Sequence, residues 1–112
     1  LPRLIGLQRA KQLAFFGDWI DATSAEAIGL VTEIHAAADF EAATTERATT
    51  LAERPPIALA QIKQSLHRSL ELGLSEALEI EAVTQAACSG TEDAEEGFRA
   101  FLEKRSPQFK GR

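Results

Sequence analysis

The sequence predicts a mainly α-helical fold of about six helices with at most one short strand. Of its 112 residues, 45% are hydrophobic, and Ala, Leu and Ile supply most of them, with few runs of β-branched residues. Apolar residues also recur at helical spacing in several stretches that Gly or Pro bounds. A chain of this length holds one domain at most.

The first half of the chain is expected to form three helices and at most one short strand. Residues 7–16 repeat apolar side chains at helical spacing up to a glycine. Asp21 caps a short helix over residues 22–28. Residues 30–34 alternate in polarity as a strand does, although a lone strand needs partners to be stable. Residues 39–53 form a helix rich in Ala and Thr.

Two amphipathic helices follow. Pro56 suits the first turn of a helix over residues 57–72, because that turn needs no backbone amide. Ser75 is expected to cap a helix over residues 76–88. The apolar residues of the first of these helices share one face, which is expected to point inward. They are Leu59, Ile62, Leu66 and Leu70.

The last helix is expected to begin at Asp93, where Glu96 completes a capping-box pattern, and a proline stops it. Gly97 costs about 1 kcal/mol against Ala inside a helix, so we expect a close helix contact there. Phe101 and Lys104 lie one turn apart on one face. A ring beside an ammonium suits a ligand with an aromatic base and phosphates. Core packing of the ring and solvation of the ammonium explain the same pattern.

Charge is unevenly distributed along the chain. The formal net charge is −5, which argues against nucleic-acid binding through a basic face. No Lys or Arg occurs between Arg68 and Arg99, whereas Lys104, Arg105 and Lys110 crowd the tail. A solvated acidic face and a helix-end cluster explain this pattern; alternatively, the basic tail meets a phosphate. No signal peptide or membrane-spanning run is visible, so we expect a cytoplasmic protein that binds no membrane.

The sequence offers no catalytic residue and no metal site. It has no glycine-rich phosphate loop and no His/Cys cluster with metal-ligand spacing. Cys88 lies among alanines and is expected to be a small buried hydrophobe rather than a nucleophile. His67 and Glu71 could be an acid–base pair, but their spacing is that of a surface pair on a helix. The glutamate pairs lie in first turns of helices, where the helix dipole explains them.

Short motifs occur in a fixed order along the chain. They are Leu1-Pro2-Arg3-Leu4-Ile5-Gly6, Gly17-Asp18-Trp19-Ile20-Asp21-Ala22, Ala25, Gly29-Leu30-Val31, Pro55-Pro56, Asp93, Glu96-Gly97, Ala100-Phe101 and Glu103-Lys104-Arg105-Ser106-Pro107-Gln108-Phe109. In this order they resemble the enoyl-CoA hydratase/isomerase (crotonase) family over essentially the whole chain. Members of that family often carry Glu near position 24, where this chain has Ser24. The difference removes a helix-capping option but no chemistry.

The resemblance implies a C-terminal segment that lacks the N-terminal catalytic half. In this family two backbone amides hold the thioester oxygen of an acyl-CoA, and carboxylates move protons. Those groups belong to a region upstream of Leu1, and a start at Leu rather than Met hints at a fragment. Residues 1–35 would end the crotonase core with connecting helices. Residues 36–112 would form the C-terminal helical domain, and we expect the chain to be neither compact alone nor active alone.

The resemblance also implies a substrate contact and partners. Phe101 and Lys104 match the aromatic and lysine residues that contact CoA in the family. CoA enters as part of the thioester substrate, so no separate cofactor is expected. The full-length enzyme would be a homotrimer or hexamer that acts in fatty-acid β-oxidation. Among the reactions of the family, 2-enoyl-CoA hydration is the one that we expect. Isomerase, dehydratase and thioester-hydrolase reactions remain alternatives, as does a non-catalytic helical interaction module.

Overall fold

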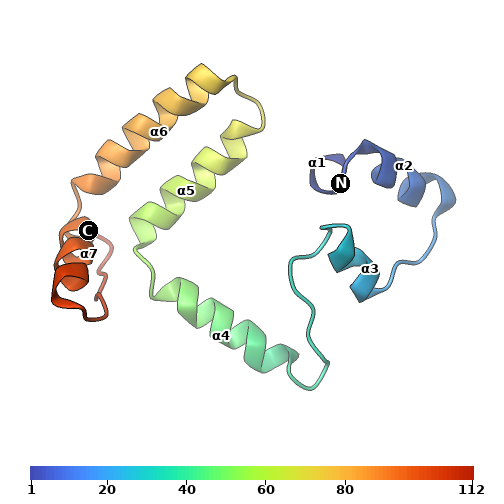
Figure 1. Ribbon diagram of the computed structural model, residues 1–112, viewed down its shortest axis with the longest axis horizontal. Helices are drawn as coiled ribbons and strands as arrows, with labels where there is room; N and C mark the ends of the chain where they lie inside the picture. Colours follow the sequence, from blue (N-terminus) through green and yellow to red (C-terminus); the bar gives the residue numbers. More distant parts are fainter. The chain divides into compact units, whose positions relative to one another are not determined.

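The computed structural model describes residues 1–112 and contains seven helices and no strand. The helices are α1 (Pro2–Ile5), α2 (Leu7–Phe16), α3 (Ala22–Ala27), α4 (Phe40–Ala52), α5 (Pro56–Ser69), α6 (Leu74–Ser89) and α7 (Glu92–Glu103) (Figure 1). The mainly α-helical class is confirmed. The structure divides into two compact units, residues 1–44 and 45–112, and α4 crosses the boundary. The expected division at residue 35 stays a prediction.

The first unit contains one helix more than the sequence predicted. The additional helix, α1, is a single turn that packs against α2 and buries Ile5. Gly6 separates the two helices with a φ of 79°, which a residue with a side chain rarely adopts. Asp21 caps α3 as expected, because its carboxylate accepts a hydrogen bond from the Ser24 amide at 2.7 Å.

The strand expected at residues 30–34 does not form. The amides of Leu30 and Val31 instead donate to the Ala25 carbonyl, at 2.8 and 3.4 Å, and close the end of α3. The remainder of the segment is irregular. The physical reason is that no second strand exists in the chain to accept and donate ladder hydrogen bonds.

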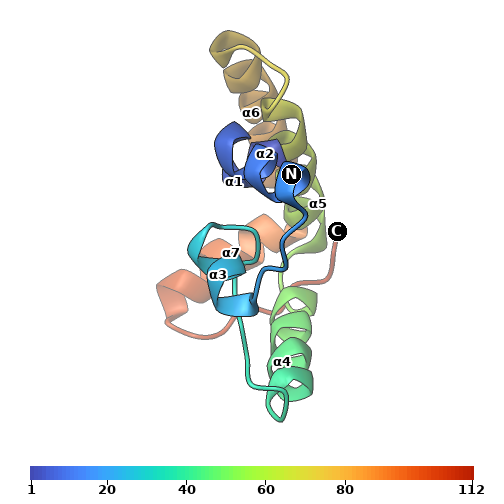
Figure 2. The ribbon, with the colours of Figure 1, turned by 90° about the vertical axis from the view of Figure 1, so that its right-hand side faces the viewer.

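In the second unit, α5 and α6 form an antiparallel hairpin, which can be followed in Figures 1 and 2. Pro56 occupies the first turn of α5 as predicted. A hydrogen bond between the hydroxyls of Ser65 and Thr84, with Oγ and Oγ1 3.4 Å apart, connects the two helices.

The expected cap of α6 is wrong. Gly73, not Ser75, precedes the helix, and its amide donates to the Glu76 carboxylate at 3.1 Å. A glutamate in the third helical position can satisfy the amide ahead of the helix by itself. The turn therefore needs no serine hydroxyl.

Most large apolar side chains of the chain are exposed. The hydrophobic residues that are buried are Ile5, Ala10, Ala25 and Ala100. The face of α5 that was expected to point inward is open to solvent, and Leu66, for example, is 63% exposed. Helical periodicity indicates which residues share a face but not whether a partner covers it. None of the seven helices combines the length and the apolar character that crossing a bilayer requires.

Candidate functional site

The last helix, α7, begins at Glu92, one residue before the start that the sequence predicted. Thr91 is its N-cap: its hydroxyl oxygen accepts from the Ala94 amide at 3.1 Å, and the hydroxyl donates to the Cys88 carbonyl at 2.7 Å. The assignment of Asp93 as the cap is therefore wrong. A threonine two positions upstream satisfies the first-turn amide and leaves Asp93 inside the helix.

Asp93 holds the C-terminal tail against α7. Its side chain is almost fully buried, with 3% of the residue exposed. One carboxylate oxygen accepts from the Lys110 amide at 2.6 Å and the other from the Gly111 amide at 2.8 Å. The Asp93 amide in turn donates to the Arg112 carbonyl at 3.2 Å. A buried carboxylate is acceptable here because backbone donors satisfy both of its oxygens.

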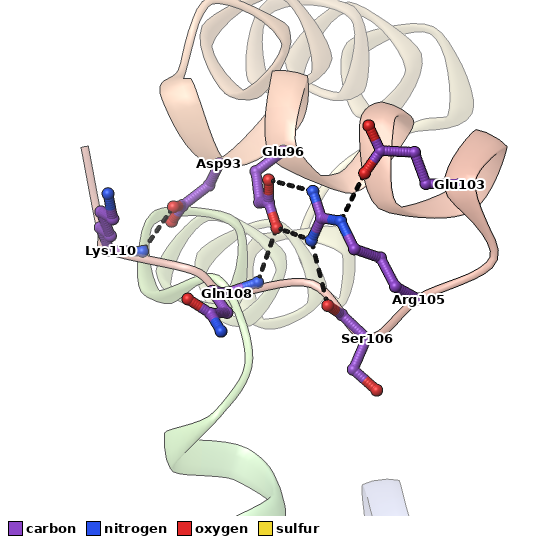
Figure 3. Close-up of polar contacts among 7 residues, drawn as sticks. All are labelled: Asp93, Glu96, Glu103, Arg105, Ser106, Gln108 and Lys110. Atoms are coloured by element: carbon purple, nitrogen blue, oxygen red, sulfur yellow. Dashed lines mark hydrogen bonds and ion pairs between the residues drawn. The ribbon is translucent and has the colours of Figure 1, made fainter.

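Glu96, one turn later, holds the other end of the tail. Its carboxylate forms a bidentate ion pair with Arg105, with Nη2 and Oε2 2.9 Å apart, and accepts from the Gln108 amide at 2.9 Å (Figure 3). Arg105 also donates to Glu103 at 2.6 Å and to the Ser106 carbonyl at 3.1 Å. We call Asp93, Glu96, Arg105 and residues 106–112 the C-terminal clasp.

The clasp perturbs the titration of its charged groups. The hydrogen bond from Arg105, followed by that from the Gln108 amide, lowers the pKa of Glu96 from 4.5 to about 2. The same carboxylate, together with Glu103, raises the pKa of Arg105 further above its ordinary value. Glu96 and Arg105 therefore both stay charged throughout the physiological pH range.

Two glycines, Gly97 in α7 and Gly111 in the tail, have neighbours at very different distances. The position that a Cβ of Gly97 would occupy lies 3.8 Å from Cε1 of Phe109, an ordinary van der Waals separation. The close helix contact expected at Gly97 is thus absent, and its neighbour is a ring of the tail. Gly111 has a φ of 75°, and a Cβ there would lie 2.8 Å from Cγ of Pro56. The tail consequently ends in close contact with the start of α5.

Lys104 ends α7 in a strained conformation. It is the one residue other than glycine with a positive φ, at 53°. Its amide donates to the Phe101 carbonyl at 3.3 Å, and the Arg105 amide donates to the Ala100 carbonyl at 3.1 Å. These two bonds form a Schellman motif, in which glycine usually occupies the left-handed position. A lysine there costs about 1–2 kcal/mol relative to a right-handed conformation.

The predicted site residues both lie at the surface. Phe101 is 81% exposed, and Lys104 is exposed and makes no hydrogen bond or ion pair through its side chain. Ala100, the residue before Phe101, is by contrast only 1% exposed. Their contact with CoA stays a prediction.

Sequence reasoning missed the C-terminal clasp, because Asp93 and Glu96 were interpreted as capping groups. The signal was present in the spacing. Carboxylates three residues apart share a helix face, and Arg105 follows close behind a helix end. The spacing did not indicate that residues 106–112 turn back over the face of α7 that carries Asp93 and Glu96.

Comparison with known proteins identifies the family. The family profile described as "Enoyl-CoA hydratase/isomerase" matches residues 1–112. The chain belongs to this family. Among its relatives, a "Probable enoyl-CoA hydratase" of Rhodobacter capsulatus is 40% identical over 112 residues, which are 100% of this chain and 44% of the relative. The "2,3-dehydroadipyl-CoA hydratase" of Escherichia coli is 35% identical, with the same shares covered.

Solved structures of the enoyl-CoA hydratase/isomerase family share the fold. The enoyl-CoA hydratase of Bacillus anthracis is 35% identical, with a TM-score of 0.95 over 99% of this chain and 43% of the other. A putative enoyl-CoA hydratase of Streptomyces coelicolor is 40% identical, with a TM-score of 0.94 over 100% and 41%. The chain spans less than half the length of the relatives it matches. Its helices therefore correspond to one part of the family fold.

Acidification should release the Glu96 contacts of the C-terminal clasp only at low pH. Because the folded-state pKa of Glu96 is lowered, its contribution to stability is complete above pH 4.5 and is lost as the pH falls toward about 2. The carboxyl-carbon shift of Glu96 and the amide shift of Gln108, both followed by NMR, should titrate together near the lower value. In a Glu96→Gln variant the Gln108 amide should show no such step. A Glu96 midpoint near 4.5 would contradict the ion pair.

Proposed function

We propose that this chain is the C-terminal, CoA-contacting part of an enzyme that acts on acyl-CoA thioesters. For the whole protein we propose reversible hydration of a 2-enoyl-CoA. The family match over all 112 residues carries the proposal, and the names of relatives, which include several probable enoyl-CoA hydratases, support hydration. Isomerisation is the second candidate, because a relative in Bacillus subtilis, 37% identical, is named a putative enoyl-CoA hydratase/isomerase.

The catalytic groups are proposed to lie outside this chain. Hydration needs an oxyanion hole and carboxylates that are free to move protons. Every carboxylate of the last helix except Glu95 has a structural partner: Asp93 and Glu96 hold the tail, Glu92 pairs with Arg112 at 3.0 Å, and Glu103 pairs with Arg105 at 2.6 Å. This supports a division in which residues 1–112 bind and cover substrate, while the rest of the protein supplies the chemistry.

Lys104 and Phe101 are proposed to contact the nucleotide part of CoA. Strained conformations persist where a function offsets their cost, and Lys104 occupies a left-handed position that glycine would occupy without strain. Its ammonium has no protein partner, so it is available to a phosphate. The exposed ring of Phe101, three residues earlier, offers a flat apolar surface for an adenine.

Assembly is part of the same proposal. The exposed apolar residues of α5 and α6, among them Ile62, Leu66 and Leu78, support packing against other parts of the protein or other subunits. We propose the homotrimer or hexamer implied by the resemblance, and a role in fatty-acid β-oxidation in the cytoplasm. Relatives include bacterial proteins and proteins named as mitochondrial.

The division of labour predicts that the 112-residue chain alone does not hydrate an enoyl-CoA, whereas the full-length protein does. Loss of absorbance of the conjugated thioester measures the reaction directly. The full-length protein is the positive control, and crotonyl-CoA is a suitable first substrate. Turnover by the isolated chain would show that a catalytic centre lies within residues 1–112.

Replacing Lys104 with glycine should change the stability of the protein and its affinity for a CoA thioester in opposite directions. In the full-length protein, Lys104→Gly should raise the free energy of unfolding by about 0.5–1 kcal/mol, because glycine relieves the left-handed strain but loses more entropy on folding. The same change should weaken CoA-thioester binding by roughly five- to tenfold, because a charged phosphate partner is lost. Denaturant unfolding and calorimetric titration measure the two effects.

The matched control for this change is Lys63→Ala, which removes the same charge from an exposed position on α5. It should leave CoA affinity unchanged. An affinity that is equally unchanged in Lys104→Gly would show that Lys104 is a surface charge without a role in binding.

A further inference from the structure

We propose that Glu96 is a positioning residue for the CoA thioester. It acts through Arg105 and the Gln108 amide, which together hold Lys104 in its left-handed conformation and direct its ammonium toward the CoA phosphates. The inference rests on the proposed function, because it assumes that Lys104 contacts CoA. It adds a residue on the second turn of α7 that would not itself touch substrate.

The backbone around Lys104 is fixed on both sides. On the helix side, its amide and the next one are bonded to the Phe101 and Ala100 carbonyls. On the tail side, the Arg105 guanidinium lies against Glu96, with a second bond to Glu103 (Figure 3). Rotation of Lys104 toward a right-handed conformation would redirect the chain after it. Arg105 would then be withdrawn from Glu96.

Glu96 also binds the chain beyond Arg105. Its Oε1 accepts from the Gln108 amide at 2.9 Å, so one carboxylate holds positions 105 and 108 together. The turn at residues 104–108 is therefore closed on both ends by a single side chain. A left-handed lysine is unfavourable by itself, and this closure is what keeps it in place.

The ion pair has a second, electrostatic consequence for Lys104. Glu96 and Glu103 are the carboxylates nearest in sequence to the helix end, and Arg105 binds both. Both carboxylates are held by Arg105, and Lys104 makes no ion pair of its own. Its ammonium is therefore not bound to a carboxylate and is available to an anionic phosphate.

The test compares two substrates of the full-length enzyme, an enoyl-CoA and the matching enoyl-pantetheine, which lacks the phosphorylated nucleotide. Glu96→Gln should raise KM for the enoyl-CoA by roughly three- to tenfold and leave kcat within about twofold. It should leave KM for the enoyl-pantetheine unchanged. Glu95→Gln is the matched control: it removes the same charge from an adjacent, exposed residue whose side chain makes no hydrogen bond or ion pair, and it should change neither KM.

An equal rise of KM for both substrates would overturn the proposal, because it would indicate general damage to the fold. So would an unchanged KM for the enoyl-CoA. If Glu96→Gln folds poorly, Arg105→Lys, which keeps the charge but loses the bidentate geometry, should give the same substrate-selective rise in KM. An equal effect of Arg105→Lys on both substrates, or no effect, would likewise overturn the proposal.

Lys104→Ala separates this inference from the proposed function. In that background, Glu96→Gln should have no further effect on KM for the enoyl-CoA, because the residue that it positions is gone. If Lys104→Ala alone leaves KM unchanged, the CoA contact fails and the positioning role fails with it. If Lys104→Ala raises KM and Glu96→Gln does not, the contact stands and the positioning role is overturned.

Discussion

The end of this chain depends on two carboxylates of one helix face. Residues 106–112 form no helix or strand, so their amides need other acceptors. Asp93 and Glu96 supply these acceptors for Gln108, Lys110 and Gly111. The same interactions fix the turn that follows α7. Without them, neither the strained conformation at the helix end nor the contact of the tail with the start of α5 would be defined.

Helical periodicity predicted most of the fold. Six helices begin and end within a few residues of their expected positions, because apolar spacing, glycines and prolines are local signals. Errors occurred where local signals compete. Thr91 and Asp93 are both good capping residues, and only the position of the tail decides which one remains free to cap. Residues 30–34 have a strand pattern, but strands need partners that this chain does not contain.

The candidate site was predictable only in part. Phe101 and Lys104 were identified by resemblance to a family, since a ring and an ammonium one turn apart fit ordinary packing equally well. The residues that hold Lys104 in place were not identified, because an ion pair between Glu96 and Arg105 requires the chain to reverse after the helix. The strained φ of Lys104 was likewise visible only in the backbone. That strain is the structural observation that distinguishes Lys104 from an ordinary surface lysine.

A crystal structure of the full-length protein with a bound CoA thioester would test the Lys104 contact most directly. We expect Nζ of Lys104 to lie within about 3 Å of a phosphate oxygen of CoA. We also expect Lys104 to keep its positive φ and Glu96 to bind Arg105 still. A Lys104 side chain directed into solvent, with the CoA phosphates held by other residues, would show that Lys104 does not contact CoA.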